Sequence, residues 1–431
     1  MKSRIFLLLG IGIIILIVIV YISINEELNN NVSHRKATKM KQEVSNNKDK
    51  YITVGAIDCD YKTIKEALAS KNEKRKIIYI MDKIHTEPGI EISKDITICG
   101  FGKENTIIQA ADKLKLSEDR VFLINKKANV KLKGLTIRHG KITEIPRGGG
   151  GIKNLGKLSI EACEISLNKA TYGVGINNKG YLNINRSVIA KNIGIKRPIK
   201  DALHGVDCGG SGGGLNVERG SEVVIRNSLI IDNKSVANGG GIHVNCEGKA
   251  KLINCTVARN KGGKQGGGIS VRGDLELIHC TITENDSRVK LGCGVFVMGK
   301  IDMFATLIVN NKYSNFALGE GAGYYGKGIL DKSEYNFIGD INNSNLKGVT
   351  YFISEDIKLY PLQDNGGSTK TYALDFNSSA VDVIPEDESF VTVDQRGVIR
   401  DKGPSDIGAY EVEKTISKRI KNFIRDINPL Y

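Results

Sequence analysis

Tryptophan is absent from this chain of 431 residues, and proline occurs only 7 times beside 49 glycines. Collagen-like chains and glycine-rich disordered chains are both rich in proline, so the composition argues against either class. Glycine without proline instead indicates a folded body with many tight turns. The length exceeds that of an average domain, but repeat proteins grow by adding units, so length alone does not predict two domains.

A dense basic patch is also missing from the sequence. The formal charge is +14, of which the first 50 residues contribute +4 and the last 20 contribute +3, so the body keeps +7. A nucleic-acid-binding surface is normally denser and more clustered, and we expect no nucleic acid as a partner. The charge is compatible with an acidic glycan or a negatively charged envelope, although solvated surface charge is the simpler explanation.

One long hydrophobic run is present, from Phe6 to Ile22, and Lys2 and Arg4 precede it. Its 17 residues reach the short end of a membrane span. No small-x-small cleavage site follows, which favours a retained signal anchor over residues 1–24, with a cytoplasmic start and an extracytoplasmic body. The alternative is a cleaved signal peptide and a secreted body. Residues 25–50 are polar and are expected to form a flexible linker.

Six segments of the central region repeat one pattern. Each begins with a glycine cluster and an apolar residue and ends in a phrase such as LINCTVARN or LIHCTITEN. The first apolar residues are Ile152, Ile176, Leu215, Ile242, Ile269 and Val295, at spacings of 24, 39, 27, 27 and 26. A unit of this length, with short β-rich runs and no helix, fits one coil of a parallel β-helix, in which each strand pairs with its equivalents in the neighbouring coils.

Alternation within the repeats predicts which side chains face the core. Ile242 and Val244 are expected to point inward, while the residue between them points outward. The phrase-ending asparagines are expected to stack as a ladder at one turn: Asn168, Asn192, Asn233, Asn260, Asn285 and Asn310. Small residues occupy another equivalent position and are expected to fill the core: Cys163, Ser187, Ser228, Cys255 and Cys280.

The 8 cysteines show no C-x-x-C or Cys/His metal pattern. An even number in an exported protein permits disulfides without defining their pairing. Cys255 and Cys280 are expected on adjacent coils near disulfide range, and a Cys208–Cys246 bridge would pin the long insertion of the repeat.

Two helices are expected outside the repeat. Residues 61–70 read as a short helix that covers the open N-terminal end of the core. Residues 412–431 form a basic amphipathic pattern, expected to be either a packing cap or a membrane-surface helix. The cap is the simpler alternative.

The motifs TIKEAL and GIEISKDITICGFGKENTIIQA, followed by the glycine repeats, resemble the opening coils of pectin-lyase-like right-handed β-helix proteins. The stretch PLQDNGGSTKTYAL, with SSAVD, DQRG and DIGAYE further on, resembles the C-terminal module of choice-of-anchor Q proteins. This resemblance covers roughly residues 51–411 and implies an all-β, single-stranded right-handed parallel β-helix on an exported surface protein. It implies no defined reaction. The chain departs from the family pattern in its N-terminal anchor and its cysteines.

A ligand-binding face is predicted on the outward residues of the first strand of each coil. Amides and mixed polar groups suit sugar hydroxyls, and the row contains several of them. The predicted ligand-binding residues are Lys153, Asn177, Asn216, Glu218, His243, Asn245, Ser270 and Arg272. Phe296 and Met298 continue the two rows at their C-terminal end.

Catalysis is not the expected activity, because these rows lack the paired carboxylates of a glycosidase. The long insertion at residues 194–212 offers weak catalytic candidates in Asp201, His204 and Asp207, which suit an acid–base or metal cluster but match no metal motif. A solvated loop is the simpler explanation. The family resemblance also draws attention to charged C-terminal residues, for which a hydrogen-bonded end-cap is favoured: Asp382, Asp394, Arg396, Asp406 and Glu411. No cofactor is expected, although a lyase would require Ca²⁺.

The expected organisation is an anchor (1–24), a linker (25–50), the β-helix (51–355), a C-terminal module (356–411) and a tail (412–431). The expected function is that of a membrane-anchored, adhesin-like surface protein that binds carbohydrate or another envelope component. A polysaccharide lyase or glycoside hydrolase acting on an acidic glycan is the first alternative. An architectural spacer of the envelope is the second.

Overall fold

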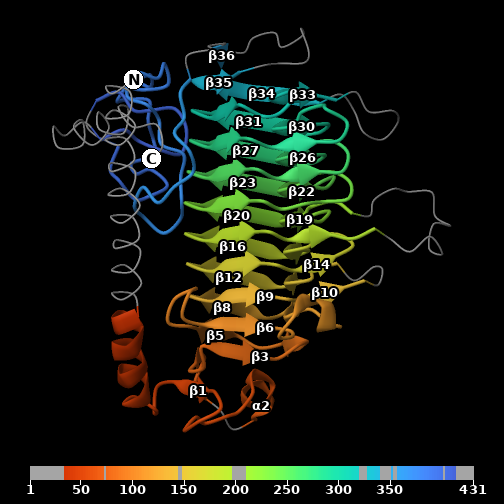
Figure 1. The fold of residues 1–431 in the computed structure, drawn as a ribbon, viewed down its shortest axis with the longest axis vertical. Coiled ribbons are helices and arrows are strands. Elements are labelled where there is room, and N and C mark those ends of the chain that lie inside the picture. Colours follow the sequence, from red (N-terminus) through yellow and green to blue (C-terminus); the bar gives the residue numbers. More distant parts are fainter. Residues whose placement is uncertain are drawn as a thin grey trace, which may run out of the picture.

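The computed structural model describes residues 34–71, 74–143, 148–196, 210–319, 328–339, 351–352, 357–400 and 403–413. Over these residues the chain forms a parallel β-solenoid of about 10 turns, which is consistent with a right-handed β-helix. Figure 1 shows the coils stacked along the long axis of the molecule, while the blue C-terminal segment returns along one side of the stack. The all-β repeat fold predicted from the sequence is therefore confirmed.

Three parallel sheets form the walls of the solenoid. Sheet A contains β1 (Ile52–Val54), β2 (Ile77–Ile80), β5 (Ile96–Cys99), β8 (Asn129–Lys133), β12 (Lys157–Glu161), β16 (Tyr181–Asn185), β20 (Glu222–Arg226), β23 (Lys249–Ile253), β27 (Asp274–Ile278), β31 (Lys300–Phe304) and β34 (Ile329–Glu334). Sheet B contains β3 (Ile84–Thr86), β6 (Ile107–Gln109), β9 (Thr136–Arg138), β13 (Glu164–Ser166), β17 (Val188–Ala190), β21 (Leu229–Ile231), β24 (Thr256–Ala258), β28 (Thr281–Thr283), β32 (Leu307–Val309), β35 (Asn336–Ile338) and β36 (Tyr351–Phe352).

Sheet C contains β4 (Ile90–Ile92), β7 (Phe122–Ile124), β11 (Ile152–Asn154), β15 (Ile176–Asn178), β19 (Leu215–Val217), β22 (Ile242–Val244), β26 (Ile269–Val271), β30 (Val295–Val297) and β33 (Phe316–Leu318). Short two-residue strands lie between sheets B and C: β10 (Lys141–Ile142), β14 (Lys169–Ala170), β18 (Ile193–Gly194), β25 (Lys261–Gly262) and β29 (Asp286–Ser287).

Inward-facing side chains of the three sheets form one continuous hydrophobic cluster along the axis. Ile242 and Val244 belong to it and are fully buried, whereas His243 between them does not. Each strand pairs in register with its equivalent, as in the row Leu215, Ile242 and Ile269. The inward and outward alternation predicted from the repeat is therefore confirmed.

An asparagine ladder runs along the turn after sheet B. Asn233 donates its backbone and side-chain N–H groups to Asn260 Oδ1 at 3.0 Å each, and the other rungs repeat this geometry. The rungs are Asn168, Asn192, Asn233, Asn260, Asn285, Asn311 and Asn315. Asn310, which the repeat predicted as a rung, is exposed with φ of 56° and is not one.

Small side chains fill the turn between sheets A and B, as predicted. The backbone N–H of Cys163 donates to Ser187 Oγ at 3.1 Å, and that of Ser187 donates to Ser228 Oγ at the same distance. Cys255 and Cys280 continue the column and are fully buried. All the cysteines in the described part of the chain are free thiols, and Cys208 of the predicted Cys208–Cys246 bridge lies outside it.

Two helices cover the N-terminal coils. Helix α2 (Ile64–Ala69) begins in a capping box between Thr63 and Glu66 and buries Ile64 and Ala67 against the core, as predicted for a cap. Residues 34–45, in the stretch whose composition predicts a flexible linker, are also helical. The apolar stripe of Ala37, Met40 and Val44 explains this helix, because it packs on Tyr79 and Phe101 of the first coils.

The C-terminal segment 357–413 lies along the outer face of sheet B. Tyr372 packs on the outward side chains of β17, β21 and β24, and Tyr410, Ile407 and Leu374 pack near those of β32. Backbone contacts support the docking, since Gly408 N–H donates to the carbonyl of Ala305 at 2.9 Å. The described residues of this segment thus flank the solenoid, and none of them belongs to the hydrophobic cluster along its axis.

The predicted membrane anchor, residues 1–24, and most of the predicted tail helix, 412–431, lie outside the described residues. Among the helices that the structure does describe, none has both the length and the hydrophobicity needed to cross a membrane.

Candidate functional site

The predicted ligand-binding row lies on the outer face of sheet C. Lys153, Asn177, Asn216, His243 and Ser270 occupy one register column, as the repeat predicted. Phe296 continues this column. However, the side chains from Asn177 to Phe296 are buried, each with about 2% of its surface exposed. The column therefore does not form an open surface in the described part of the molecule.

The glycine turns explain part of this burial. Gly239, with φ of 64°, precedes β22 and folds back so that a Cβ at this position would overlap the carbonyl oxygen of Ile242 and contact His243. A left-handed glycine occupies the same place in the other coils: Gly149, Gly173, Gly212, Gly266 and Gly292. Each turn thus lies over the outward residue of its own strand, which only a residue without a side chain permits.

Polar groups in this buried column interact with one another. Asn216 Nδ2 donates to Asn177 Oδ1 at 2.9 Å, while Asn216 Oδ1 and His243 Nδ1 are buried without a hydrogen-bond partner among the described residues. Burial lowers the pKa of His243 to about 3, and the nearby Arg272 guanidinium adds to the effect. His243 is therefore neutral at physiological pH.

The second predicted row is less buried. Glu218, Asn245 and Arg272 follow the sheet C strands and are each partly exposed. The structure thus brings Asn216, His243, Asn245 and Arg272 close together. Their role in binding stays a prediction.

The catalytic candidates Asp201, His204 and Asp207 all lie outside the described residues. Within the described ranges, no three His, Cys, Asp or Glu side chains come together in a way that would hold a metal ion. The weak catalytic candidates of the insertion, the solvated loop that is their simpler alternative, and the Ca²⁺ of a lyase therefore all stay predictions.

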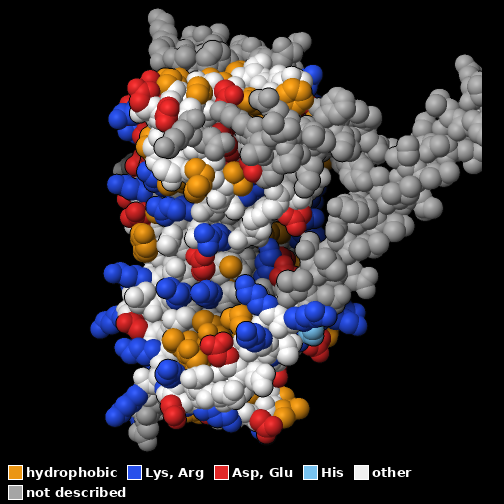
Figure 2. Space-filling model, turned by 90° about the vertical axis from the view of Figure 1, so that its left-hand side faces the viewer, with side chains coloured by type: hydrophobic (Ala, Val, Ile, Leu, Met, Phe, Trp, Pro, Cys, Tyr) orange, Lys and Arg blue, Asp and Glu red, His pale blue; other side chains and the backbone are white. Residues whose placement is uncertain are grey.

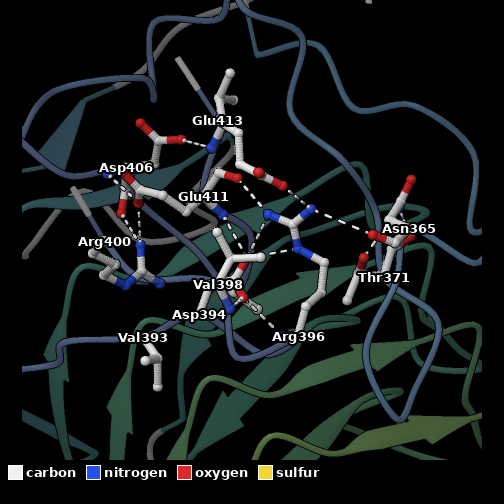
Figure 3. A network of polar contacts seen from close by, with 12 residues as sticks. Asn365, Thr371, Val393, Asp394, Arg396, Val398, Arg400, Asp406, Glu411 and Glu413 are labelled. Carbon is white, nitrogen blue, oxygen red and sulfur yellow. Dashed lines mark hydrogen bonds and ion pairs between the residues drawn. The ribbon is translucent and has the colours of Figure 1, made fainter. Parts of the chain in front are cut away.

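The charged C-terminal residues form a buried network between the segment 357–413 and the solenoid (Figure 3). Arg400 binds Glu411 Oε2 at 2.6 Å and donates to the Gly408 carbonyl at 2.9 Å. Arg396 binds Asp394 Oδ2 at 2.7 Å and the Glu411 carbonyl at 2.6 Å. The arginine and carboxylate side chains of both pairs are nearly inaccessible.

Backbone N–H groups satisfy the carboxylates of this network as well. Asp406 accepts from Asp382 N–H at 2.9 Å and from Val412 N–H at 2.6 Å. Burial, with the charge of Glu411, raises the pKa of Asp406 to about 7. These groups hold the segment together and are closed to solvent, so the hydrogen-bonded structural network predicted from the sequence is present. Its predicted place as an end-cap is wrong, because the segment packs on the outer face of sheet B.

The network also reaches the solenoid itself. Arg400 donates to Asn254 Oδ1 at 3.3 Å, and Thr256 Oγ1 donates to Gln395 Oε1 at 2.6 Å. The outer face of sheet B is thereby covered between β17 and β35.

Sheet A is the wall whose outer face stays accessible over most of the described part of the solenoid. From β8 to β31 its first outward column consists of Asn129, Lys157, Tyr181, Glu222, Lys249, Asp274 and Lys300. All but Lys300 are exposed, and Lys300 is half-buried. The repeat did not single out these residues because sheet A lacks the glycine clusters by which the coils were aligned.

An open groove of about 250 Å³ crosses sheet A from β20 to β31. Charged side chains line it: Glu222, Lys249, Lys251, Asp274, Glu276, Lys300 and Asp302. Lys251 binds Glu276 at 2.8 Å, and Lys300 lies 3.9 Å from Asp302. Figure 2 shows the same mixture on another face, where basic and acidic side chains are interspersed over the height of the molecule.

No family model, no curated protein and no solved structure matches the chain.

Proposed function

We propose that this chain is a membrane-anchored, extracytoplasmic β-solenoid that binds carbohydrate or another polymer of the cell envelope. The observation that carries the proposal is the open outer face of sheet A. The C-terminal segment covers sheet B from β17 to β35, and the first outward column of sheet C is buried from Asn177 to Phe296. Sheet A, in contrast, has a long row of exposed side chains that are mostly polar.

The geometry of sheet A suits an extended ligand. Parallel strands repeat at about 4.8 Å, so equivalent side chains form straight rows across many coils. A linear polymer lying across the strands meets a new set of polar side chains at every coil, and many weak contacts add up along its length. The groove from β20 to β31 provides such a path.

The location of the protein is part of the proposal. The hydrophobic run from Phe6 to Ile22, with Lys2 and Arg4 before it, supports an anchor with the body outside. The resemblance to pectin-lyase-like β-helices and to the choice-of-anchor Q module supports an exported, adhesin-like protein. Protease added to intact cells should digest the body, whereas a body that is protected until the cells are lysed would contradict this orientation.

Binding can be tested with envelope material and the full chain in detergent. The double variant Lys251→Ala and Glu276→Ala removes one ion pair from the groove without leaving a lone charge. Its matched control is Arg219→Ala with Glu247→Ala, which removes an exposed ion pair outside sheet A. We expect the groove variant to bind purified cell wall at least several-fold more weakly and the control to bind like the wild type.

Two results would decide against the proposal. Equal binding by both double variants would exclude the groove as the binding surface. No binding by the wild-type chain to any envelope fraction would favour the architectural spacer.

A further inference from the structure

Three aromatic residues occupy outward positions on the strands of sheet A, and two of them are covered. Tyr79 stacks on Phe101 at 5.5 Å between ring centroids, and Phe304 lies 4.8 Å from Phe390 of the C-terminal segment. Tyr181 on β16 has no such ring contact among the described residues and is 42% exposed. The ring of Tyr181 is therefore open to a ligand, and its neighbours in the same outward column, Lys157 and Glu222, are polar and exposed.

The residues around Tyr181 provide polar groups that the fold does not use. Asn183, two positions along β16, has a buried Oδ1 without a hydrogen-bond partner among the described residues. Asn185 on the same strand differs, because its amide donates to Glu161 Oε2 at 3.1 Å and accepts from Asn227 at 3.1 Å. A buried amide oxygen that lacks a donor costs free energy unless water or a ligand supplies one.

The groove begins beside these two residues. Tyr181 is in register with Glu222, and Asn183 is in register with Val224, and both Glu222 and Val224 line the groove. The ring of Tyr181, the amide of Asn183 and the apolar Val224 thus lie together at the β20 end of the groove. This combination is typical of saccharide sites, where a sugar ring packs on an aromatic side chain and its hydroxyls bind amides.

The charges of the groove select the kind of saccharide. Four acidic residues and three lysines line it, so their formal charges nearly cancel. Lysines already paired with carboxylates, such as Lys251 with Glu276, have little attraction left for an anionic ligand. An acidic glycan would therefore gain little from this surface, whereas an uncharged glycan has hydroxyls for both acids and lysines.

We propose that Tyr181 and Asn183 form a subsite for one ring of an uncharged glycan, whose chain continues across β20, β23, β27 and β31. This inference rests on the proposed function, because it names the ligand class and the anchoring residues of the same face. Tyr181 supplies the stacking surface, and Asn183 supplies an amide for a ring hydroxyl.

The test measures binding of defined hexasaccharides to the full chain in detergent by isothermal titration calorimetry. The probes are neutral hexamers of glucose, mannose and N-acetylglucosamine, and a hexagalacturonate as the acidic counterpart. The variants are Tyr181→Ala, Tyr181→Phe and Asn183→Ala. Tyr313→Ala is the matched control, since Tyr313 is also 42% exposed but lies outside sheet A.

We expect at least one neutral hexamer to bind, and to bind at least tenfold more weakly to Tyr181→Ala. Tyr181→Phe should keep most of the affinity because the ring remains, Asn183→Ala should lose several-fold, and Tyr313→Ala should match the wild type. Two results would overturn the subsite but not the proposed function. In the first, a neutral hexamer binds Tyr181→Ala as tightly as the wild type. In the second, only the acidic hexamer binds. If no hexamer and no envelope polymer binds the wild type, the subsite and the proposed function both fail.

Discussion

At the scale of single residues, the asparagine ladder concentrates many hydrogen bonds in one buried column. Asn311 accepts two N–H groups of Asn285 at 2.9 Å and donates to the carbonyl of Ile282 at 3.0 Å. Replacing it by alanine leaves those groups buried without partners, so Asn311→Ala should lower the free energy of unfolding by about 2–4 kcal/mol. Urea unfolding followed by circular dichroism would measure this loss.

The neighbouring asparagine is the matched control. Asn310 is exposed with φ of 56°, a conformation that glycine adopts without strain, so Asn310→Gly should change the stability by less than about 0.5 kcal/mol. Equal effects of the two substitutions would show that the ladder does not pass through Asn311.

Asn310 and Asn311 also show which rungs of the ladder the repeat pattern can predict. Five rungs from Asn168 to Asn285 follow from the aligned phrases alone. The last phrase ends in two asparagines, and the pattern cannot say which of them is two residues beyond the strand. The register of Leu307 with Thr281 settles this, because it places Asn311 opposite Asn285.

His243 makes stability depend on pH. Its folded-state pKa is lowered to about 3, so between the ordinary value of 6.5 and 3 the unfolded chain binds a proton that the native state does not. The native state therefore loses stability as the pH falls through this window, by up to about 1.4 kcal/mol per pH unit for one such group.

The variant His243→Asn removes this proton and should flatten the acid dependence. Urea midpoints at pH 7, 6, 5 and 4 would compare it with the wild type. Two other buried groups affect the pH dependence of stability equally in both proteins. Burial lowers the pKa of His279 and raises that of Asp406, so their contributions have opposite signs. Parallel pH curves for wild type and variant would mean that His243 is not buried as a neutral base.

At the scale of elements, the glycine turns before sheet C decide whether its outer face is open. Gly239 and Gly220 both have left-handed φ, of 64° and 69°, but only Gly239 has close neighbours, because nothing lies within 4 Å of the place for a Cβ at Gly220. Gly220→Ala should therefore cost only the backbone strain, about 1–2 kcal/mol.

Gly239→Ala adds a clash with the carbonyl oxygen of Ile242 to the same strain, so its loss should exceed that of Gly220→Ala by at least about 2 kcal/mol. Thermal unfolding of both variants would give the difference. Similar losses would indicate that the turn before β22 moves away from the strand at little cost.

The glycine turns before sheet C also explain why the sequence predicted only part of the candidate site. Alternation correctly placed Asn216 and His243 outside the core, since it depends only on the two-residue period of a strand. Their burial depends on how the preceding turn folds back, and a glycine cluster indicates a turn without giving its direction. The open face on sheet A was missed for the complementary reason, because Tyr181 and Lys249 stand in strands without a distinctive motif.

At the scale of the whole molecule, the C-terminal segment 357–413 packs along the outer face of sheet B and is called the clasp below. The sequence indicates that sheet B is covered on its outer face, because β17 and β21 are apolar at every position. Such strands are typically buried on both faces. The repeat pattern alone could not identify the covering segment, since the contacts join residues more than 100 positions apart, such as Asn254 and Val393.

The buried arginine of this clasp provides the last prediction. Arg400 is almost inaccessible and donates to Glu411, to the carbonyls of Asp406 and Gly408, and to Asn254 of the solenoid. Arg400→Ala leaves a buried carboxylate and two carbonyls without these donors, which should cost about 3–5 kcal/mol. Because the solenoid has its own core, we expect the loss to release the segment and to leave the coils folded.

Limited proteolysis would show this release as rapid cleavage within residues 357–413, followed by a resistant fragment that contains the coils. Arg219→Ala is the control, since it removes an arginine from an exposed ion pair and should digest like the wild type. If Arg400→Ala instead makes the coils and the segment equally sensitive, the two form one cooperative unit and the clasp is a part of the core. If it digests like the wild type, the apolar contacts of Tyr372 and Leu374 hold the segment without the ion pair.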